Sequence, residues 1–324
     1  MTTYKGINGT AVQNFAGDPT NPIEGQVWYD SVAATFQYSS VTTAGAWSTG
    51  GNLNTARYFA QNGAGTQTTA LVFGGQTPTS TAITESYNGS AWTEVNDLNT
   101  VRFGTGAGGT QTSALLAGGQ APSPVNSTSS ESWNGTCWTA TPSLNLGRQY
   151  LAGAIDVNTA GIVFGGLIAP GFTNARAETE LWNGSVWAEV NDLNTARRSL
   201  PGVGSSIAGL AMGGYNTAAT AVANTESYNG TCWAEVADQS TVGGASFGTQ
   251  SSALKNNGTT TEIWNGTSWS TTTSASSPAS NRSGVGTSSL GLLAGGETGG
   301  AATVATTEEW IGAGSPLIQT FTDS

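Results

Sequence analysis

Histidine is absent from the 324 residues of this chain, so the most common catalytic base is missing. Nucleophilic sites of the Ser-His-Asp or Cys-His type, and metal sites with histidine ligands, therefore cannot form. Glycoside hydrolysis needs only two carboxyl groups beside a glycosidic bond, and this chemistry stays open as a minor alternative. The candidate carboxylates are Asp97, Asp192, Asp238 and Glu297, which are predicted to lie on or near one face of the fold derived below.

A glutamate and an arginine recur in the copies of an internal repeat. A catalytic residue is needed once, so residues that recur in nearly every copy are interpreted as structural. A buried carboxylate needs a partner. We therefore expect each glutamate to bind the arginine or the backbone groups of the neighbouring structural unit, described below as a blade. The glutamates are Glu85, Glu131, Glu180, Glu226, Glu262 and either Glu308 or Glu309; the arginines are Arg57, Arg102, Arg148, Arg197 and Arg282.

Each full repeat contains a short apolar run that usually ends in Gly-Gly, then a Glu-x-aromatic-Asn-Gly segment, and then a tryptophan. Asn-Gly between two aromatic-bearing segments predicts a tight hairpin. Each repeat is therefore predicted to form four antiparallel strands, and its length is typical of a propeller blade. We expect the tryptophans to pack between blades; they recur every 36 to 49 residues and are Trp47, Trp92, Trp138, Trp187, Trp233 and Trp269.

The Gly-Gly pair, the Glu-x-aromatic-Asn-Gly hairpin and the tryptophan together resemble kelch repeats over about residues 47–311. This resemblance implies an all-β fold, a kelch-like β-propeller, and the repeats give a count of six blades. The last repeat lacks a fourth strand, and we expect the strand around Trp47 to complete it and close the ring. A seventh blade from a hairpin over 27–38 is a less favoured alternative. The repeat over 243–270 is degenerate, because its arginine is missing and Lys255 interrupts its apolar run.

The two faces of such a propeller differ in sequence variability. The Asn-Gly turns are nearly identical, whereas the loops between second and third strands vary in length and content. Variable loops on a rigid scaffold usually carry recognition. We therefore predict a binding face on these loops and on the connections between blades, with the candidate binding residues Phe172, Tyr215, Asp97, Asp192 and Glu297. A sugar-binding surface normally carries more stacking rings, and the variable loops have few aromatic residues besides Phe172 and Tyr215. A lectin-like function is therefore kept only as an alternative.

Charge and composition argue against several partners. Nine lysines and arginines stand against 20 acidic residues, for a formal net charge of −11, so neither nucleic acid nor an anionic membrane surface is expected as a partner. We expect no cleaved leader and no membrane insertion, because no apolar run is long enough. Cys137 and Cys232 are interpreted as small core residues of non-adjacent blades, so no disulfide, metal site or cofactor is predicted.

Residues 1–46 lie outside the repeat and are predicted to form an attachment segment with a β-hairpin, before a propeller over 47–324. Residues 21–30 and the aromatic residues after them resemble a segment of virion-associated proteins and tail fibres of tailed phages, and the repeats resemble kelch-like proteins of those phages. The resemblance implies a non-enzymatic virion protein, such as a tail-fibre component, with a structural or host-recognition role. The N-terminal segment would bind other virion proteins, and the loop face a host glycan or protein; a homo-oligomer is left open. The alternatives are a carbohydrate-binding propeller and, less favoured, a glycan-degrading enzyme.

Overall fold

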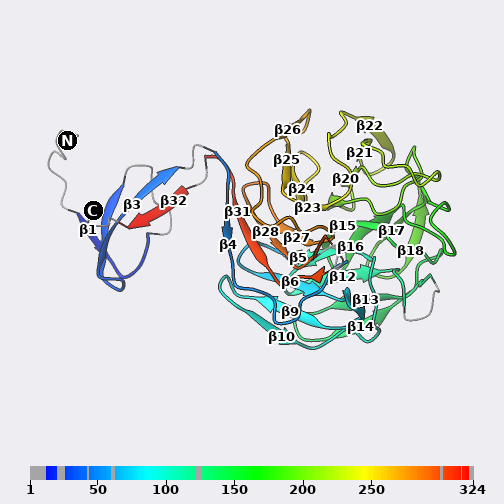
Figure 1. The fold of residues 1–324 in the computed structure, drawn as a ribbon. Coiled ribbons are helices and arrows are strands. Elements are labelled where there is room, and N and C mark those ends of the chain that lie inside the picture. Colours follow the sequence, from blue (N-terminus) through cyan, green and yellow to red (C-terminus); the bar gives the residue numbers. More distant parts are fainter. Residues whose placement is uncertain are drawn as a thin grey trace. The chain divides into compact units, whose positions relative to one another are not determined.

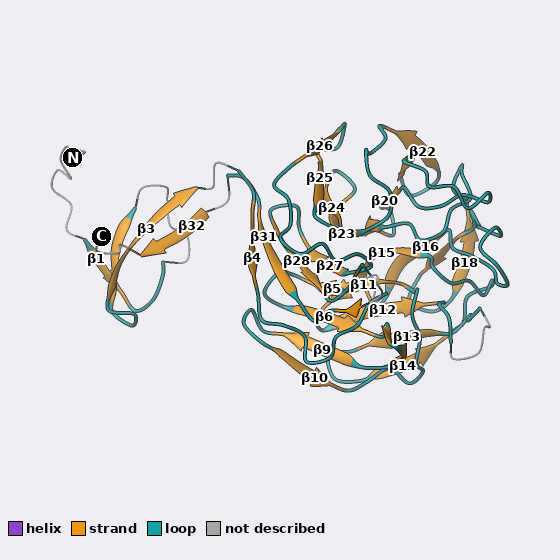
Figure 2. Ribbon diagram, in the orientation of Figure 1, coloured by secondary structure: helices purple, strands orange, loops and turns teal. Residues whose placement is uncertain are grey.

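The computed structural model of the protein describes residues 12–19, 26–41, 44–59, 63–121, 126–299, 302–314 and 316–320. These residues form strands, turns and loops, with no helix among them (Figure 2). The prediction of an all-β fold is therefore confirmed. The chain forms two compact units, one of Met1–Ala46 with Ile311–Ser324 and the other of Trp47–Trp310.

The larger unit is a propeller of six four-stranded sheets, or blades. The first strands of successive blades touch in a closed circle, in the order β5, β11, β15, β19, β23, β27 and back to β5. Figure 1 shows first strands near the centre of the ring and last strands such as β10, β14 and β18 at its rim. In blades one to five, neighbouring strands are antiparallel.

Blades one to three follow one another along the chain, and their strands are β5 (Ala64–Gly65), β6 (Ala70–Phe73), β9 (Thr84–Tyr87) and β10 (Trp92–Val95); β11 (Gly106–Thr110), β12 (Ser113–Ala117), β13 (Ser130–Trp133) and β14 (Trp138–Thr141); and β15 (Ala152–Val157), β16 (Ala160–Phe164), β17 (Thr179–Trp182) and β18 (Trp187–Val190). Blades four and five consist of β19 (Gly202–Ser205), β20 (Ala208–Met212), β21 (Thr225–Tyr228) and β22 (Trp233–Val236), and of β23 (Ala245–Thr249), β24 (Ser252–Asn257), β25 (Thr260–Trp264) and β26 (Trp269–Thr271). Two short hairpins lie in the variable loops of blades one and six, namely β7 (Gln76–Thr77) with β8 (Thr79–Ser80), and β29 (Glu297–Thr298) with β30 (Ala302–Thr303).

Blade six joins the two ends of the ring, as predicted. Its strands, in order across the sheet, are β27 (Ser283–Gly286), β28 (Leu290–Ala294), β31 (Thr307–Ile311) and β4 (Ala46–Thr49), which contains Trp47. Just after β4, the Gly50 N–H donates to the Thr307 carbonyl at 3.0 Å. This pairing satisfies the backbone groups of two strands that would otherwise be open edges.

Apolar side chains fill the spaces between adjacent blades. Between blades one and two, for example, Leu71 and Phe73 pack with Leu116, Trp133 and Trp138 in one cluster. The indole N–H groups of three repeated tryptophans each donate at 3.1 Å to the hydroxyl of the threonine that begins the third strand of the preceding blade; these are Trp92 to Thr307, Trp138 to Thr84 and Trp233 to Thr179. Trp92, Trp138, Trp187 and Trp233 are buried, and Trp47 and Trp269 are half-buried at the same interfaces. The structure therefore places the tryptophans between neighbouring sheets, where they bury apolar area.

The smaller unit is a separate four-stranded sheet of β1 (Gln13–Phe15), β2 (Val27–Asp30), β3 (Thr35–Val41) and β32 (Pro316–Thr320), in that order. The hairpin considered as a seventh blade is β2 with β3, and it belongs to this unit. The prediction that the propeller extends to residue 324 needs correction, because β32 belongs to the smaller unit. The reason is that β32 pairs antiparallel with β3, a partner almost 300 residues earlier that local patterns could not indicate.

Candidate functional site

The repeated glutamates are buried and bind cations, which accounts for most of the positive charge in the propeller. Arg57 lies in the connection leading into β5, and Glu85 lies in β9 of that same blade. The expected partners were the arginine or the backbone groups of the neighbouring blade. The structure corrects the arginine, because each ion pair forms within one repeat. The six ion pairs are Arg57–Glu85 (3.1 Å), Arg102–Glu131 (2.5 Å), Arg148–Glu180 (2.9 Å), Arg197–Glu226 (2.8 Å), Lys255–Glu262 (3.5 Å) and Arg282–Glu308.

Each carboxylate also attaches the incoming connection to the sheet. In blade one, the Asn54 backbone N–H and side-chain amide both donate to Glu85 Oε2, at 2.7 and 2.9 Å. Asn99, Asn145 and Asn194 repeat this arrangement in blades two to four. Burial lowers the pKa of Arg57, although the nearby Glu85 charge acts in the opposite direction. These glutamates and arginines are therefore structural groups, because each carboxylate is paired with a buried cation and with the connection inside its own blade.

The aspartates proposed for catalysis or binding also make backbone hydrogen bonds. Asp97 and Asp192 accept from the backbone N–H groups of Thr84 and Thr179, both at 3.0 Å. Asp238 accepts from Thr225 in the same way at 3.3 Å. Each aspartate holds the first residue of a third strand in its own blade. Asp97 and Asp192 thus lie in connections that leave two different blades, and each repeats one structural contact.

Glu297 lies in β29, in the variable loop of blade six. Its backbone exchanges hydrogen bonds with Ser280, both at 2.9 Å, and its carboxylate accepts from the Asn281 side-chain amide at 2.6 Å. Desolvation raises the pKa of Tyr58, and the nearby charge of Glu297 raises it further. Glu297 therefore lies beside the connection into blade one.

Phe172 and Tyr215 are brought together by a residue that the sequence analysis did not single out, Arg198. The Arg198 guanidinium carbon lies over both rings, 4.9 Å from each centroid. Phe172 comes from the variable loop of blade three, Tyr215 from that of blade four, and Arg198 from the connection between these blades. We call these three residues the Arg198 site.

Four further aromatic rings, also not singled out by sequence, meet on the inner part of the loop face. Phe59 lies 4.7 Å from Tyr58, 5.9 Å from Phe103 and 5.6 Å from Tyr150, measured between ring centroids. Tyr58, Phe59 and Tyr150 are half-buried, and Phe103 is buried. We call these four residues the aromatic cluster. The signal was present in the sequence, because these residues lie one or two positions after repeated arginines in three successive connections.

The backbone beneath the aromatic cluster is unusual. Phe59, Tyr150, Ser199 and Asn281 adopt left-handed conformations, with φ between 51° and 55°. Successive connections are joined by N–H to carbonyl bonds, from Phe59 to Asn281 at 3.0 Å, from Tyr150 to Gly104 at 2.7 Å and from Ser199 to Tyr150 at 2.8 Å. A left-handed non-glycine residue costs about 1–3 kcal/mol, and such residues cluster at functional sites. The face is therefore held rigidly in a conformation that the backbone does not prefer.

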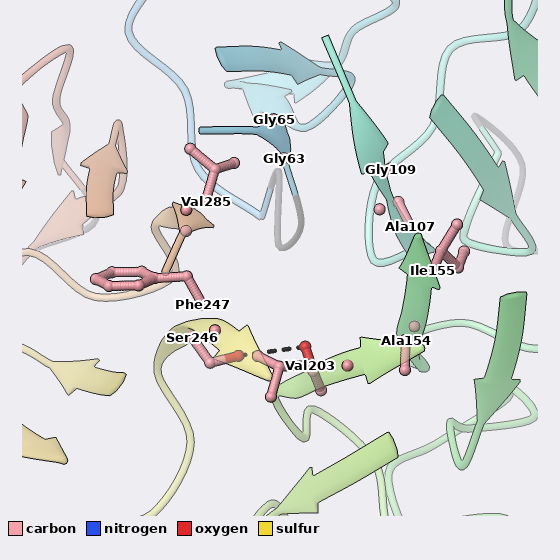
Figure 3. A pocket seen from close by; sticks show the side chains of 17 residues that line it. Gly63, Gly65, Ala107, Gly109, Ala154, Ile155, Val203, Ser246, Phe247 and Val285 are labelled. Atoms are coloured by element: carbon pink, nitrogen blue, oxygen red, sulfur yellow. Dashed lines mark hydrogen bonds between the residues drawn. The ribbon is translucent and has the colours of Figure 1, made fainter. Parts of the chain in front are cut away.

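The central channel, unlike the loop face, is lined mainly by small apolar residues (Figure 3). It holds a cavity of about 90 Å³ lined by the first strands of the blades. Glycine, alanine, valine and isoleucine make up most of the lining, together with Phe247 and Ser246, whose hydroxyl donates to the Gly202 carbonyl at 3.4 Å (Figure 3). The lining of this cavity contains no ionisable side chain.

The cysteines were predicted in the core, and the structure shows that this is wrong. Cys137 and Cys232 are exposed in the Asn-Gly turns, as free thiols. The Asn134 side chain accepts the backbone N–H groups of Thr136 and Cys137, both at 2.9 Å, and Asn229 does the same in blade four. This tight turn leaves the position before the tryptophan at the surface.

Among the described residues, no group of three or more cysteine, aspartate or glutamate side chains is arranged to hold a metal ion. That part of the chain also has no helix that could cross a membrane. No protein-family model matches the sequence, and no curated protein matches it significantly.

Proposed function

We propose that this protein is a non-enzymatic recognition protein that binds a saccharide on the loop face of its propeller. The observation that carries the proposal is the aromatic cluster on a rigid backbone. Sugar rings present apolar C–H faces that stack on aromatic side chains, and Tyr58 and Tyr150 add hydroxyl groups at the same place. The aromatic cluster supports the lectin-like alternative, because the small number of aromatic rings in the variable loops was the argument against sugar binding.

A binding role fits the side chains of the loop face better than a catalytic role does. The carboxylates of Asp97 and Asp192 accept backbone hydrogen bonds in repeated positions. A glycosidase needs one carboxyl group with a raised pKa beside a second one, across the bond to be cleaved. The buried glutamates are occupied in ion pairs, which supports a scaffold role for them.

The biological setting that we propose is the surface of a tailed-phage particle, on the basis of the resemblance in the repeats and in residues 21–30. The smaller unit would attach the protein to other virion components, and the propeller would contact the host. The smaller unit contains both ends of the chain, and the two links to the propeller pass through β4 and β31, which are neighbours in blade six.

Binding is tested with the full chain on a glycan array, followed by titration of the best glycan. We expect Tyr58→Ala and Tyr150→Ala each to weaken binding by about tenfold, as is typical for an aromatic residue central to an interface. Phe36→Ala is the matched control, because Phe36 is an exposed aromatic residue of the smaller unit. Absence of binding to every glycan on the array would refute the saccharide proposal.

Location is tested by quantitative mass spectrometry of purified phage particles from cells that produce the protein. We expect a fixed number of copies per particle, together with reduced adsorption when the gene is deleted. A protein found only in the lysate, and not in the particles, would contradict the proposed setting while leaving saccharide binding intact.

A further inference from the structure

The positive charges of this acidic protein are almost all neutralised within the fold. Six of its nine cationic side chains form the buried ion pairs with the repeated glutamates. Arg176 pairs with Glu178 at the surface. Lys5 lies outside the described residues. Within the described ranges, this leaves Arg198 as the cationic residue whose side-chain nitrogens have no carboxylate oxygen within 4.0 Å.

The guanidinium of Arg198 is fixed in place but has unused hydrogen-bonding capacity. Its Nε donates to the Phe172 carbonyl at 2.9 Å, and its Nη1 has a long contact of 3.4 Å with the Ser199 hydroxyl. A guanidinium has five N–H donors, so those on Nη2 and one on Nη1 have no acceptor among the described protein atoms. Arg198 is half-buried, and desolvation lowers its pKa, yet an arginine side chain stays charged at neutral pH.

The surroundings of Arg198 are preorganised. Arg198 and Tyr215 exchange backbone hydrogen bonds at 3.0 and 2.9 Å, which fixes the ring beside the guanidinium. The loop that carries Phe172 is closed by two bonds between Ile168 and Asn174, both at 3.2 Å. A site that is ordered before binding loses less conformational entropy when its ligand arrives.

The Arg198 site is next to the aromatic cluster. The Ser199 N–H, one residue after Arg198, donates to the Tyr150 carbonyl at 2.8 Å. Desolvation raises the pKa of Tyr150, and the positive charge of Arg198 opposes that effect, so the two side chains are close enough to interact electrostatically. One ligand could therefore contact a ring of the cluster and the guanidinium together.

We infer that Arg198 selects saccharides that carry an oxyanion, namely a carboxylate, sulfate or phosphate substituent. This inference rests on the proposed saccharide-binding function and specifies its ligand. The planar fork of a guanidinium donates two parallel hydrogen bonds to such a group, and the rings of Phe172 and Tyr215 hold the plane and limit its hydration. Because the protein carries a net charge of −11, its overall field opposes an anion, and the unpaired charge of Arg198 attracts one locally.

The alternative is that Arg198 only ties the two loops together. The two roles differ in what they predict for specificity. Loss of a tie would lower the stability of the loops and weaken all ligands alike, whereas loss of an anion-binding group would remove the preference for the acidic member of a pair.

The experiment compares the full-length protein and its variants on matched glycan pairs, each a neutral glycan and the same glycan with a terminal sialic acid, uronic acid, sulfate or phosphate. We expect the wild type to prefer the acidic member, and Arg198→Met to lose about tenfold to a hundredfold in affinity for it with little change for the neutral one. Arg198→Lys should keep part of the preference, because it retains the charge but not the fork. Comparison among the four acidic groups identifies the substituent.

Arg176→Met is the matched control, because it removes the other half-buried arginine, one that already has Glu178 as its partner. Thermal unfolding of each variant checks that the propeller is intact. Equal binding of both members of each pair, or an Arg198→Met variant with the acidic preference of the wild type, overturns this inference and leaves the proposed function standing. No binding to any glycan overturns both.

Discussion

Blades four and five solve the same electrostatic problem with different residues. In blade four, Arg197 reaches Glu226 from the incoming connection, at 2.8 Å. In blade five that position is Gly243, and the cation is Lys255, which reaches Glu262 at 3.5 Å from the second strand, β24. The residue that seemed to interrupt the apolar run of a degenerate repeat is the replacement for its missing arginine.

Blade six has a third arrangement. The Ser276 N–H donates to Glu308, just as the Asn194 N–H donates to Glu226 in blade four. Counting three residues onward from each, Ala279 of blade six occupies the position of Arg197. The cation of blade six is Arg282, three residues further along the chain. The comparison teaches that the fold requires a positive charge beside each buried carboxylate, whichever chain position provides it. An uncompensated buried charge costs several kcal/mol, which is a large part of the stability of a protein.

The sharpest test of the comparison removes the carboxylate from each blade. Glu226→Gln leaves Arg197 buried and unable to lose its proton, and we expect it to lower the free energy of unfolding by about 3–5 kcal/mol. Glu262→Gln should cost clearly less, because Lys255 can become neutral. Urea unfolding at pH 7 measures both, and equal losses would show that the two cations respond alike.

The second prediction concerns pH. Burial lowers the pKa of Lys255 to about 8, while the charge of Glu262 opposes this effect. Between pH 8 and the ordinary lysine pKa of 10.5, the unfolded chain therefore binds more protons than the folded one. The stability attributable to Lys255 must then rise with pH across this window, by about 3 kcal/mol.

This rise is measured as the difference between the wild type and Lys255→Met, in urea unfolding from pH 7.5 to 10.5. The subtraction removes the titration of tyrosines and of the other groups common to both proteins. A difference that stays constant or falls with rising pH would contradict a lowered pKa for Lys255.

A smaller effect is expected for the aspartates that follow the last strands of blades three and four. Asp192→Asn and Asp238→Asn both keep an oxygen that can accept the backbone N–H of Thr179 or Thr225. We expect each change to cost about 1 kcal/mol or less, because the net contribution of one such hydrogen bond is of that size. Melting temperatures test this, and a loss comparable to that of Glu226→Gln would assign these aspartates a larger role.

The smallest effect is expected in the Asn-Gly turns. Cys232 of blade four and Ser268 of blade five occupy the same turn position, so Cys232→Ser gives the two blades the same residue there. Because Cys232 is exposed, we expect a change in unfolding free energy within about 0.5 kcal/mol. A thiol reagent should also label both cysteines in the folded protein, and protection from it would contradict their exposure.

Local sequence patterns were sufficient to predict the repeating unit, the number of blades and the closure of the ring. These features come from local patterns, because Asn-Gly favours one turn and the apolar runs mark strands that a propeller must bury. Even the strand around Trp47 was identifiable, since its distance to the next connection matches that in the complete repeats.

The folded structure was needed to show which cation serves each glutamate, that β32 joins the N-terminal sheet, and which side chains gather on the loop face. Phe172 and Tyr215 come from two variable loops and Arg198 from the connection between their blades, whereas the aromatic cluster comes from three other connections. The physical reason is that ring closure brings connections of successive blades together at the centre. Contacts there depend on the direction and length of each connection, which a pattern along the chain does not specify.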